Sequence, residues 1–473
     1  MPLSWLLLPI FVNRSDWKHR LPWRILVLVA SFFFLGFNQP DLNFGIIALP
    51  LPCVVLGSSI IGNYFLTNIM MNQTSQKSKK IILSAGIVAN VSLLGYFKYR
   101  NFVLEQTYNI FSGSFELPRL SSLIIPIAIS FFTFQAISYL VDVYRGTVEK
   151  VPFLDLAVFL SFFPHLVAGP IVRASEFIPQ LRNPINPRTV EGTRALTLIA
   201  RGLFKKMVIA DLLYVQIVRP AFGAPGTLSS LDSITAIYAY AVQLYCDFSG
   251  YTDIAIGVAL LLGFKFPENF NRPYSATSLR DFWQRWHMTL SRWLKDYVYI
   301  PMGGNRKSIF GAKFVSFNII ATMAIGGLWH GANTTFIFWG LYMGIALVIE
   351  KYLRNFNERH EIAVPAIVRK ILTFHVVTFG WIIFASESMT NAKIMIGRIF
   401  SGFSNPNEYF SLAVIGLIAC GIFIQNIPEA NTNRISSYVQ SRPIMAQAAI
   451  FGVGLMLLSA LSGNVSAFLY GFF

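Results

Sequence analysis

The sequence predicts an all-α protein that crosses a membrane many times, and two observations carry this prediction. Hydrophobic residues make up 54% of the 473 residues and charged residues only 13%, whereas roughly 25% of residues are charged in an average soluble domain. Apolar runs of near-spanning length also recur along the whole chain. A helix needs about 20 residues to cross a bilayer, so the shorter runs must tilt, be buried or stop midway. We therefore expect about 11 transmembrane helices.

The apolar runs follow one another from the N-terminus to the C-terminus. They cover residues 25–37, 44–71, 81–97, 123–141, 156–172, 234–246, 254–264, 314–329, 334–349, 371–384, 410–424 and 446–469. Pro50 and Pro52 should kink or split the second run, because each removes a backbone donor. Residues 1–12 are apolar but lack a basic segment and a small-residue cleavage site, which predicts an uncleaved anchor. No repeat and no Gly/Ser linker is present, so residues 1–473 are expected to form one domain.

The chain is strongly basic, with 38 Lys and Arg against 22 Asp and Glu and a net charge of +16. In a membrane protein this excess reflects Lys and Arg retained in cytoplasmic loops. We therefore expect membrane lipid as a partner and no nucleic acid. The basic clusters 77–80, 205–206 and 306–307 mark the cytoplasmic side, and they could also face an anionic lipid or a phosphorylated cofactor. The three cysteines are scattered, which argues against a disulfide framework or a Cys-based zinc site, and we predict no metal site.

His330 is the first candidate for chemistry, because it lies inside the apolar stretch 314–349. Ionisable groups within a membrane span are costly and are functional candidates by default. The alternative is a neutral histidine hydrogen-bonded to a carbonyl of a neighbouring helix. Gly326, Gly327 and Gly331 flank it, and they would either let a substrate approach the backbone or let two helices pack closely. The stretch alone leaves both alternatives open.

His287 is the second candidate, and it lies in the polar and aromatic segment 269–306. Ser278 with Asp281 three residues later resembles a capping box and predicts a helix start. At about 100° per residue, one face of this helix is aromatic and apolar and the other is basic. The first face comprises Trp283, Trp286, Leu290, Trp293, Leu294 and Tyr297, and the second Arg285, Arg292 and Lys295. This predicts an amphipathic helix lying in the membrane interface.

The position of His287 at the edge of the aromatic face leaves two interpretations. The side chain either looks into the protein, where a near-neutral pKa suits proton transfer, or is anchored at the lipid headgroups. Spacing alone does not bring His287 and His330 together. His375 lies in an apolar run without glycine or polar neighbours, and we interpret it as a hydrogen-bonded packing residue.

A polar island, residues 245–253, separates two apolar runs and contains Asp247 and Asp253. Its carboxylates could orient a histidine or pair with an arginine. The alternative is a capped helical turn with Asp253 near a helix start. Further along, 431–443 is predicted to be a polar loop before the last span.

Several of these segments together resemble the membrane-bound O-acyltransferase family. The resemblance is strongest over about residues 120–345, and it is closest to the branch of the alginate O-acetyltransferase membrane subunit, which is related to cellulose-acetylation and D-alanyl-transfer proteins. The segments are Ser-Phe-Phe-Thr-Phe-Gln at 130–135, Ala-Gly-Pro-Ile-Val-Arg at 168–173, Phe-Pro-Glu-Asn-Phe-Asn-Arg-Pro-Tyr at 266–274, Asp-Phe-Trp at 281–283, Arg-Trp-His at 285–287, Asp-Tyr at 296–297, Tyr-Ile-Pro at 299–301, Gly-Gly-Asn-Arg at 303–306 and Leu-Trp-His-Gly at 328–331.

The resemblance implies an acyltransferase whose helices surround a thin, funnel-shaped centre. It matches His330 to the family's catalytic histidine and His287 to its second polar position. Acyl transfer from a thioester needs a base for the acceptor's proton, and a neutral histidine in a water-poor site supplies one. Our hypothesis is that His330 is this base and that His287 positions or polarises the acyl group. Asp247, Trp329 and Asn333 are the expected supporting residues.

The resemblance also implies the substrates and the location. The donor would be acetyl-CoA or an acylated carrier in the cytoplasm, with no permanently bound cofactor. The acceptor would be an exported polysaccharide of the alginate or cellulose type, reached through a periplasmic acetyltransferase or accessory proteins of the export machinery, at the bacterial inner membrane. A competing hypothesis is a transporter or flippase of a polysaccharide precursor. Transporters commonly show inverted repeats and broken helices, and this chain has candidate breaks but no visible repeat.

Overall fold

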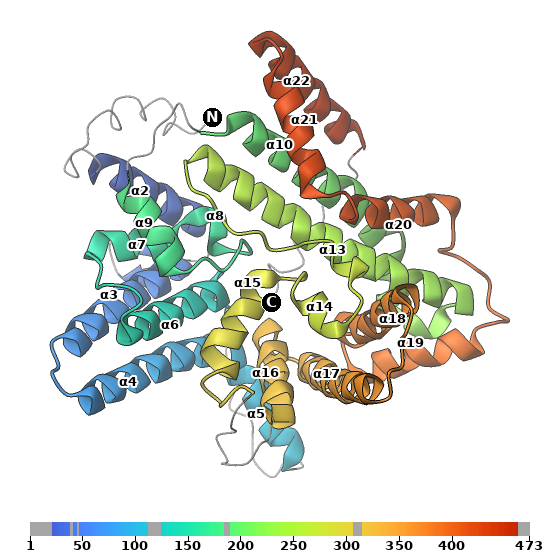
Figure 1. Cartoon of the computed structure of the whole chain (residues 1–473), viewed down its shortest axis with the longest axis horizontal. Helices are drawn as coiled ribbons and strands as arrows, with labels where there is room; N and C mark the ends of the chain where they lie inside the picture. The colour runs from blue at the N-terminus through green and yellow to red at the C-terminus, as the bar shows by residue number, and fades with distance from the viewer. Residues whose placement is uncertain are drawn as a thin grey trace. The chain divides into compact units, whose positions relative to one another are not determined.

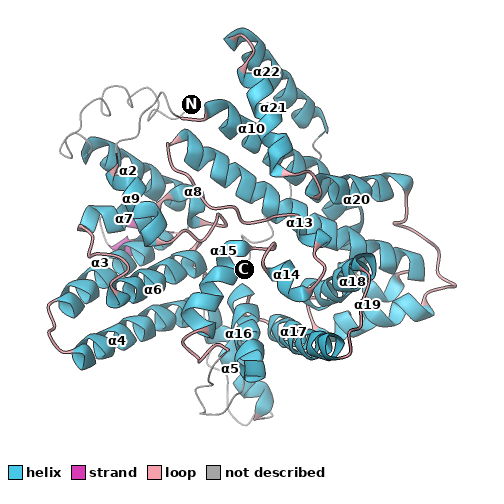
Figure 2. Cartoon of the chain, in the orientation of Figure 1, coloured by secondary structure: helices cyan, strands magenta, loops and turns pink. Residues whose placement is uncertain are grey.

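The computed structural model describes residues 21–37, 41–44, 47–111, 124–183, 190–305 and 315–461. These residues are mostly helical (Figure 1), and Figure 2 shows the strands as one small exception to the helices and their connecting loops. That exception is an antiparallel hairpin of β1 (Asp41–Phe44) and β2 (Ile47–Pro50). The predicted fold class is confirmed. The predicted anchor at 1–12 and the basic pair at 306–307 lie outside the described residues.

The chain contacts group into two compact units, Met1–Gly192 with Val258–Pro267 and Thr193–Gly257 with Glu268–Phe473. The prediction of a single domain stays a prediction. The helices described in the first unit are α2 (Leu21–Gly36), α3 (Leu51–Met71), α4 (Gln76–Leu94), the π-helix η2 (Gly95–Tyr99), α5 (Arg100–Ile110), α6 (Ile129–Arg145), α7 (Phe153–Ser161), α8 (Phe163–Leu166) and α9 (Ala174–Arg182).

The first unit shows how its prolines and buried charges shape the local structure. Strand β2 ends at Pro50 and α3 begins at the next residue, so the predicted split of the apolar run 44–71 is confirmed. The buried carboxylate of Asp155 pairs with Arg24 at 2.7 Å and with Arg182 at 3.5 Å. These ion pairs join α7 to α2 and α9.

The second unit contains the longest helix and most of the C-terminal half of the chain. Its described elements are α10 (Gly192–Leu203), the π-helix η4 (Phe204–Ala210), α11 (Asp211–Leu213), the π-helix η5 (Tyr214–Val218), α12 (Arg219–Gly223), the 3₁₀ turns η6 (Pro225–Thr227) and η7 (Pro273–Ser275), α13 (Ser230–Leu261), α14 (Leu279–Trp283), α15 (Met288–Leu294), the π-helix η8 (Lys295–Tyr299), α16 (Val315–His330), α17 (Thr334–Arg359), α18 (Ala366–Ala385), α19 (Met389–Ser401), α20 (Leu412–Gln425), α21 (Glu429–Gln440) and α22 (Ile444–Leu461).

Two sequence predictions for the second unit are wrong. Residues 234–261, which include the polar island 245–253, lie in one helix, α13, so the alternative of a helix start near Asp253 is wrong. The segment 431–443, predicted to be a polar loop, is mostly the helix α21. Local hydropathy predicted a break in the helix at 245–253 and a loop at 431–443. Within α13, however, buried polar groups find charged partners on other helices.

The predicted interfacial helix is divided in two. Ser278 caps α14 by accepting a hydrogen bond from the backbone N–H of Asp281 at 3.0 Å, as predicted. The helix ends at Trp283, and α15 begins after His287, whose φ of 41° is in the left-handed region. A helical wheel drawn through residues 278–297 therefore misplaces His287. The two faces were nonetheless predicted correctly on α15, where Leu290 and Trp293 are buried and Arg292 is exposed.

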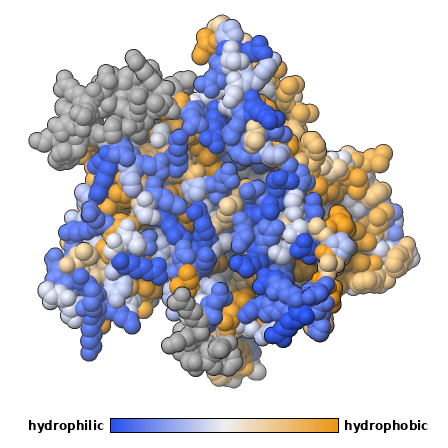
Figure 3. Space-filling view, viewed as in Figure 1, coloured by the Kyte–Doolittle hydropathy of each residue, from blue (hydrophilic) through white to orange (hydrophobic). Residues whose placement is uncertain are grey.

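Six helical segments among the described residues are long and apolar enough to cross a membrane. They are Leu51–Met71, Gln76–Ile110, Ser230–Leu261, Thr334–Arg359, Ala366–Ala385 and Ile444–Leu461. The pair α20 and α21, bent by 87°, adds a seventh if it forms one span, and α2 and α16 are shorter apolar helices. Figure 3 shows apolar surface near α19 and α20 at the right edge of the face drawn. The protein is a multi-pass membrane protein, and the expected 11 crossings are not confirmed.

Helices α16 and α17 pack backbone against backbone through glycines (Figure 1). A Cβ atom at Gly327 would collide with the Phe336 carbonyl oxygen, and one at Gly340 with the Met323 carbonyl oxygen. Small residues that let backbones approach are the usual means of packing helices in membranes. The structure therefore favours close packing over substrate approach as the role of Gly327.

Gly340→Ala is expected to lower the free energy of unfolding by about 1–3 kcal/mol, because the added methyl group meets backbone atoms that cannot rotate away. Thermal unfolding of the purified protein in detergent measures the loss. Gly397→Ala is the matched control, since a Cβ at this exposed position of α19 meets no atom within 4 Å. That exchange is expected to be neutral or stabilising by up to about 1 kcal/mol. Equal unfolding temperatures for the two variants would contradict the packing argument.

Candidate active site

His330 is the last residue of α16 and is buried, with 4% of its surface exposed. Gly331 follows it, and α17 begins at Thr334. A Cβ atom at Gly331 would collide with the ring of Phe336, so this glycine makes room for an aromatic wall beside the histidine. The predicted placement of His330 inside the protein is confirmed, at the junction of two helices.

Aromatic rings surround the imidazole of His330. The ring centroid of Trp329 lies 5.0 Å away, those of Trp339 and Phe384 lie 5.2 and 5.1 Å away, and that of Phe336 lies 6.5 Å away. These rings come from α16, α17 and α18. Such a setting excludes water. The exclusion of water strengthens electrostatic interactions and protects a reactive intermediate.

His287 is buried in the bend between α14 and α15, with 1% of its surface exposed. Its ring packs edge-on against Phe248 of α13, with centroids 4.7 Å apart. Its Nδ1 atom lies 3.1 Å from the Oδ1 atom of Asn269. The interpretation that His287 looks into the protein is confirmed, and the headgroup anchor is wrong, because the bend turns the side chain inward.

Trp329 connects the two histidines. Its ring centroid lies 6.2 Å from that of His287 and 5.0 Å from that of His330. Two buried imidazoles, one at the end of α16 and one in the α14–α15 bend, therefore pack against the same indole. The sequence predicted all three residues but not this arrangement.

Burial lowers the pKa of His287 from 6.5 to about 3, so the side chain is neutral at physiological pH. The unfolded chain then binds more protons than the folded one between about pH 3 and 6.5, and stability falls as the pH drops below 6.5. At pH 5 the loss is about 2 kcal/mol at 1.36 kcal/mol per pH unit. We expect wild type to lose more thermal stability than His287→Gln between pH 7.5 and 5. Identical losses in the two proteins would show that folding does not lower the pKa of His287.

Asp247 and Asn333 have structural partners. The fully buried carboxylate of Asp247 pairs with the ammonium of Lys206 at 2.7 Å. The Oδ1 atom of Asn333 caps α17 by accepting from the Thr335 N–H at 3.0 Å, and its Nδ2 atom donates to the Glu387 carbonyl at 2.9 Å. Asn333 thus fixes the turn after His330. The supporting catalytic roles of Asp247, Asn333 and Trp329 stay predictions.

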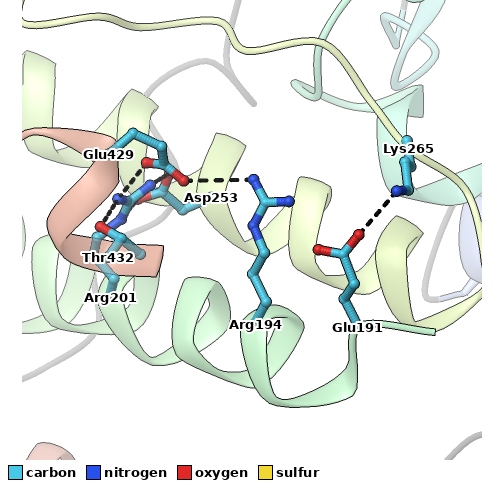
Figure 4. A network of polar contacts seen from close by, with 7 residues as sticks. All are labelled: Glu191, Arg194, Arg201, Asp253, Lys265, Glu429 and Thr432. Atoms are coloured by element: carbon cyan, nitrogen blue, oxygen red, sulfur yellow. Dashed lines mark hydrogen bonds and ion pairs between the residues drawn. The ribbon is translucent and has the colours of Figure 1, made fainter. Parts of the chain in front are cut away.

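A second carboxylate of α13, Asp253, belongs to a charged network that Figure 4 shows. It pairs with Arg201 at 2.7 Å, and Arg201 also pairs with Glu429 of α21 at 3.0 Å. Asp253 also pairs with Lys205, which the figure does not draw, at 2.7 Å. Burial lowers the pKa of Lys205, but the neighbouring Asp253 carboxylate outweighs it, and the pKa is raised overall. The predicted pairing of this island with an arginine is confirmed. The two buried carboxylates of α13 are thus paired with cations of α10 and η4.

Sequence reasoning missed the partners of both histidines. Asn269 was noted only as part of a motif, and Trp339 and Phe384 were not singled out. The polar asparagine within an aromatic motif was a signal for the first, but nothing local distinguishes the two aromatic residues. Among the described residues no group of three or more His, Cys, Asp or Glu is placed to hold a metal ion. The three cysteines are free.

Comparison with known proteins identifies the family of the chain. A model of the membrane-bound O-acyltransferase family matches residues 145–390, which include both histidines. The chain is 38% identical over 420 residues to the peptidoglycan O-acetyltransferase of Helicobacter pylori, covering 82% of this chain and 76% of that protein. It is 36% identical over 401 residues to the probable alginate O-acetylase AlgI of Pseudomonas aeruginosa, covering 84% and 73%. It is 29% identical over 279 residues to the teichoic acid D-alanyltransferase of Bacillus subtilis, covering 55% and 69%. The chain therefore belongs to the membrane-bound O-acyltransferase family and is an O-acetyltransferase.

Proposed function

We propose that the chain moves acetyl groups from a cytoplasmic thioester donor to hydroxyl groups of an exported polysaccharide. The observation that carries the proposal is the convergence of His330 and His287 on Trp329 in a buried, aromatic setting. A water-poor site with a neutral imidazole suits acyl transfer, because water would otherwise hydrolyse the acyl group. The alginate O-acetylase relatives support an acetyl group and a glycan acceptor.

In the proposed reaction His330 acts as the general base. A ring nitrogen of His330 takes the proton from the acceptor hydroxyl while the hydroxyl oxygen attacks the thioester carbonyl carbon. A C–O bond forms, the C–S bond breaks, and the departing thiolate takes the proton back from the imidazolium. His287 positions or polarises the acyl group during this step. Acetyl-CoA or an acylated carrier supplies the thioester, and no cofactor stays bound.

The names of the relatives support the choice of acceptor. We propose an alginate-type polymer as acceptor, a bacterial inner-membrane location, and delivery through a periplasmic acetyltransferase or accessory export proteins. Peptidoglycan is the second candidate acceptor, because a peptidoglycan O-acetyltransferase is 38% identical over 82% of this chain.

The test is the acetyl content of both polymers in a deletion strain with and without the wild-type gene. Restored acetyl groups on the exported polysaccharide support the proposal, and restoration on peptidoglycan alone selects the second acceptor. The purified protein is then supplied with an acetyl thioester. A transporter or flippase would leave the thioester intact, so thioester consumption separates the enzyme from that competing hypothesis.

A further inference from the structure

The side-chain oxygen of Asn269, Oδ1, makes three polar contacts. Its Oδ1 atom lies 3.1 Å from the backbone nitrogen of Thr289, 2.8 Å from the Thr289 hydroxyl and 3.1 Å from Nδ1 of His287. A backbone N–H only donates, so the atom that faces it must be the amide oxygen and not the amide nitrogen. The orientation of the Asn269 side chain is thereby determined.

This orientation determines which nitrogen of His287 carries the proton. The Asn269 oxygen has no hydrogen to donate, so Nδ1 of His287 must donate to it. In a neutral imidazole only one nitrogen carries a hydrogen, and burial keeps His287 neutral. Nε2 therefore presents a lone pair, and it accepts hydrogen bonds but cannot donate one.

Two buried polar atoms of this pair make no hydrogen bond to any described residue. They are Nε2 of His287 and Nδ2 of Asn269, and both residues are 1% exposed. Burying a polar group without a partner costs about 1–3 kcal/mol, and each such group in a native structure calls for an explanation. In this arrangement Nε2 can only accept a hydrogen bond and Nδ2 can only donate one.

The backbone of His287 supports a functional explanation. Its φ of 41° is unusual for a residue other than glycine, and such strain persists only where the surroundings enforce it. Asn269 contributes to this constraint, since its carbonyl oxygen accepts from the Met288 N–H at 2.9 Å. The same residue thus sets both the bend that turns the imidazole inward and the tautomer of its ring.

We propose that Asn269 is a positioning residue for acetyl transfer, which holds His287 as the Nδ1–H tautomer so that Nε2 accepts a hydrogen bond from an N–H or O–H group of a substrate. This proposal rests on the proposed function and narrows the part of His287 in it. His287 positions the substrate by accepting a hydrogen bond, and it does not polarise the acyl carbonyl, because that would need a hydrogen on Nε2.

The tautomer is tested directly by nitrogen NMR of the purified full-length protein labelled with ¹⁵N-histidine. The His287 signals are assigned by their absence from His287→Gln. The expected result is a protonated Nδ1 and an unprotonated Nε2 near pH 7. A proton on Nε2 in the wild type would overturn the proposal, and this readout needs no activity. An inactive wild type would defeat the proposed function alone, so the two failures are distinguishable.

Kinetics of three variants test the positioning role. Asn269→Leu removes the acceptor, and we expect acetyl transfer to fall by on the order of 10²-fold with loss of the Nδ1–H signal. Asn269→Asp keeps an oxygen opposite Nδ1, so it should retain the tautomer and most of the activity, with the pH profile moved to higher pH because a carboxylate favours the charged imidazole. Thr289→Val is the matched control, since it removes one hydrogen bond to the same oxygen but leaves the His287 contact. Its effect should stay within about fivefold.

The Michaelis constants of the Asn269 variants show which substrate donates the hydrogen bond to Nε2 of His287. The probes are acetyl-CoA and a short alginate oligosaccharide, each varied at a fixed concentration of the other. A raised KM for acetyl-CoA assigns the hydrogen to an amide N–H of the thioester, and a raised KM for the oligosaccharide assigns it to a second hydroxyl of the glycan. Full activity of Asn269→Leu, or an Asn269→Asp that is as inactive as Asn269→Leu while folded, would overturn the positioning role.

Discussion

Replacement of His330 by alanine is expected to lower acetyl transfer by about 10²- to 10⁴-fold, the usual contribution of a general base. The imidazole is buried at the end of α16 among aromatic rings. Bulk water therefore does not reach this position to act as the base in its place. The methyl group of alanine leaves the turn at Gly331 and the cap at Asn333 unchanged, and the protein should reach the membrane in normal amounts. The measurement is the acetyl content of the exported polysaccharide in a deletion strain carrying the variant, at matched membrane levels.

His375→Ala is the matched control for this prediction. His375 is a histidine of the same unit, on α18, and it is held by hydrogen bonds to the Tyr238 hydroxyl at 2.9 Å and the Ile371 carbonyl at 2.8 Å. Its predicted hydrogen-bonded role is confirmed, although its side chain is exposed. We expect normal acetylation from this variant. Full acetylation from His330→Ala would remove the base assignment from His330, and His287 would be tested next.

Asp253→Ala should destabilise the fold by about 3–5 kcal/mol, the usual cost of removing one partner from a buried ion pair. Lys205 is 4% exposed, and its ammonium would lose the carboxylate that lies 2.7 Å away. Arg201 would keep Glu429 and Thr432 of α21 but lose its pairing with α13. A lower unfolding temperature in detergent and a smaller amount of protein in the membrane are the expected results.

A surface ion pair supplies the control. Lys265 and Glu191 pair at 2.9 Å with the lysine side chain 72% exposed, and Figure 4 draws them with the buried network. Exposed pairs contribute roughly 0–1 kcal/mol, so Glu191→Ala should barely change the unfolding temperature. An Asp253→Ala variant as stable as Glu191→Ala would mean that the network does not stabilise the second unit.

Short-range features of the fold were predictable from the sequence. Pro50 ends a strand and starts α3, because its ring removes a backbone donor and presets φ. Ser278 caps α14, because its hydroxyl reaches an N–H three residues on. Both depend on atoms a few residues apart. The continuity of α13 was not predictable, because the charges that satisfy Asp247 and Asp253 come from residues about 40 or more positions away.

The candidate site likewise has features that the sequence predicted and features that it did not. His330 was predictable as a candidate because an ionisable group inside an apolar run is costly. The inward turn of His287 was not, because it depends on a left-handed residue that a regular helical wheel cannot represent. Asn269 lies 18 residues before His287, and no periodicity relates the two.

By itself the sequence determined that the chain is a multi-pass helical membrane protein and that its family is that of the membrane-bound O-acyltransferases, because composition, apolar runs and ordered motifs are properties of the chain alone. Only the tertiary structure decided that His287 and His330 share Trp329 and that Asn269 determines the His287 tautomer. The physical reason is that a ring contact or a hydrogen bond needs atoms within a few ångströms. Distant segments reach that separation only when packing and a strained backbone bring them together.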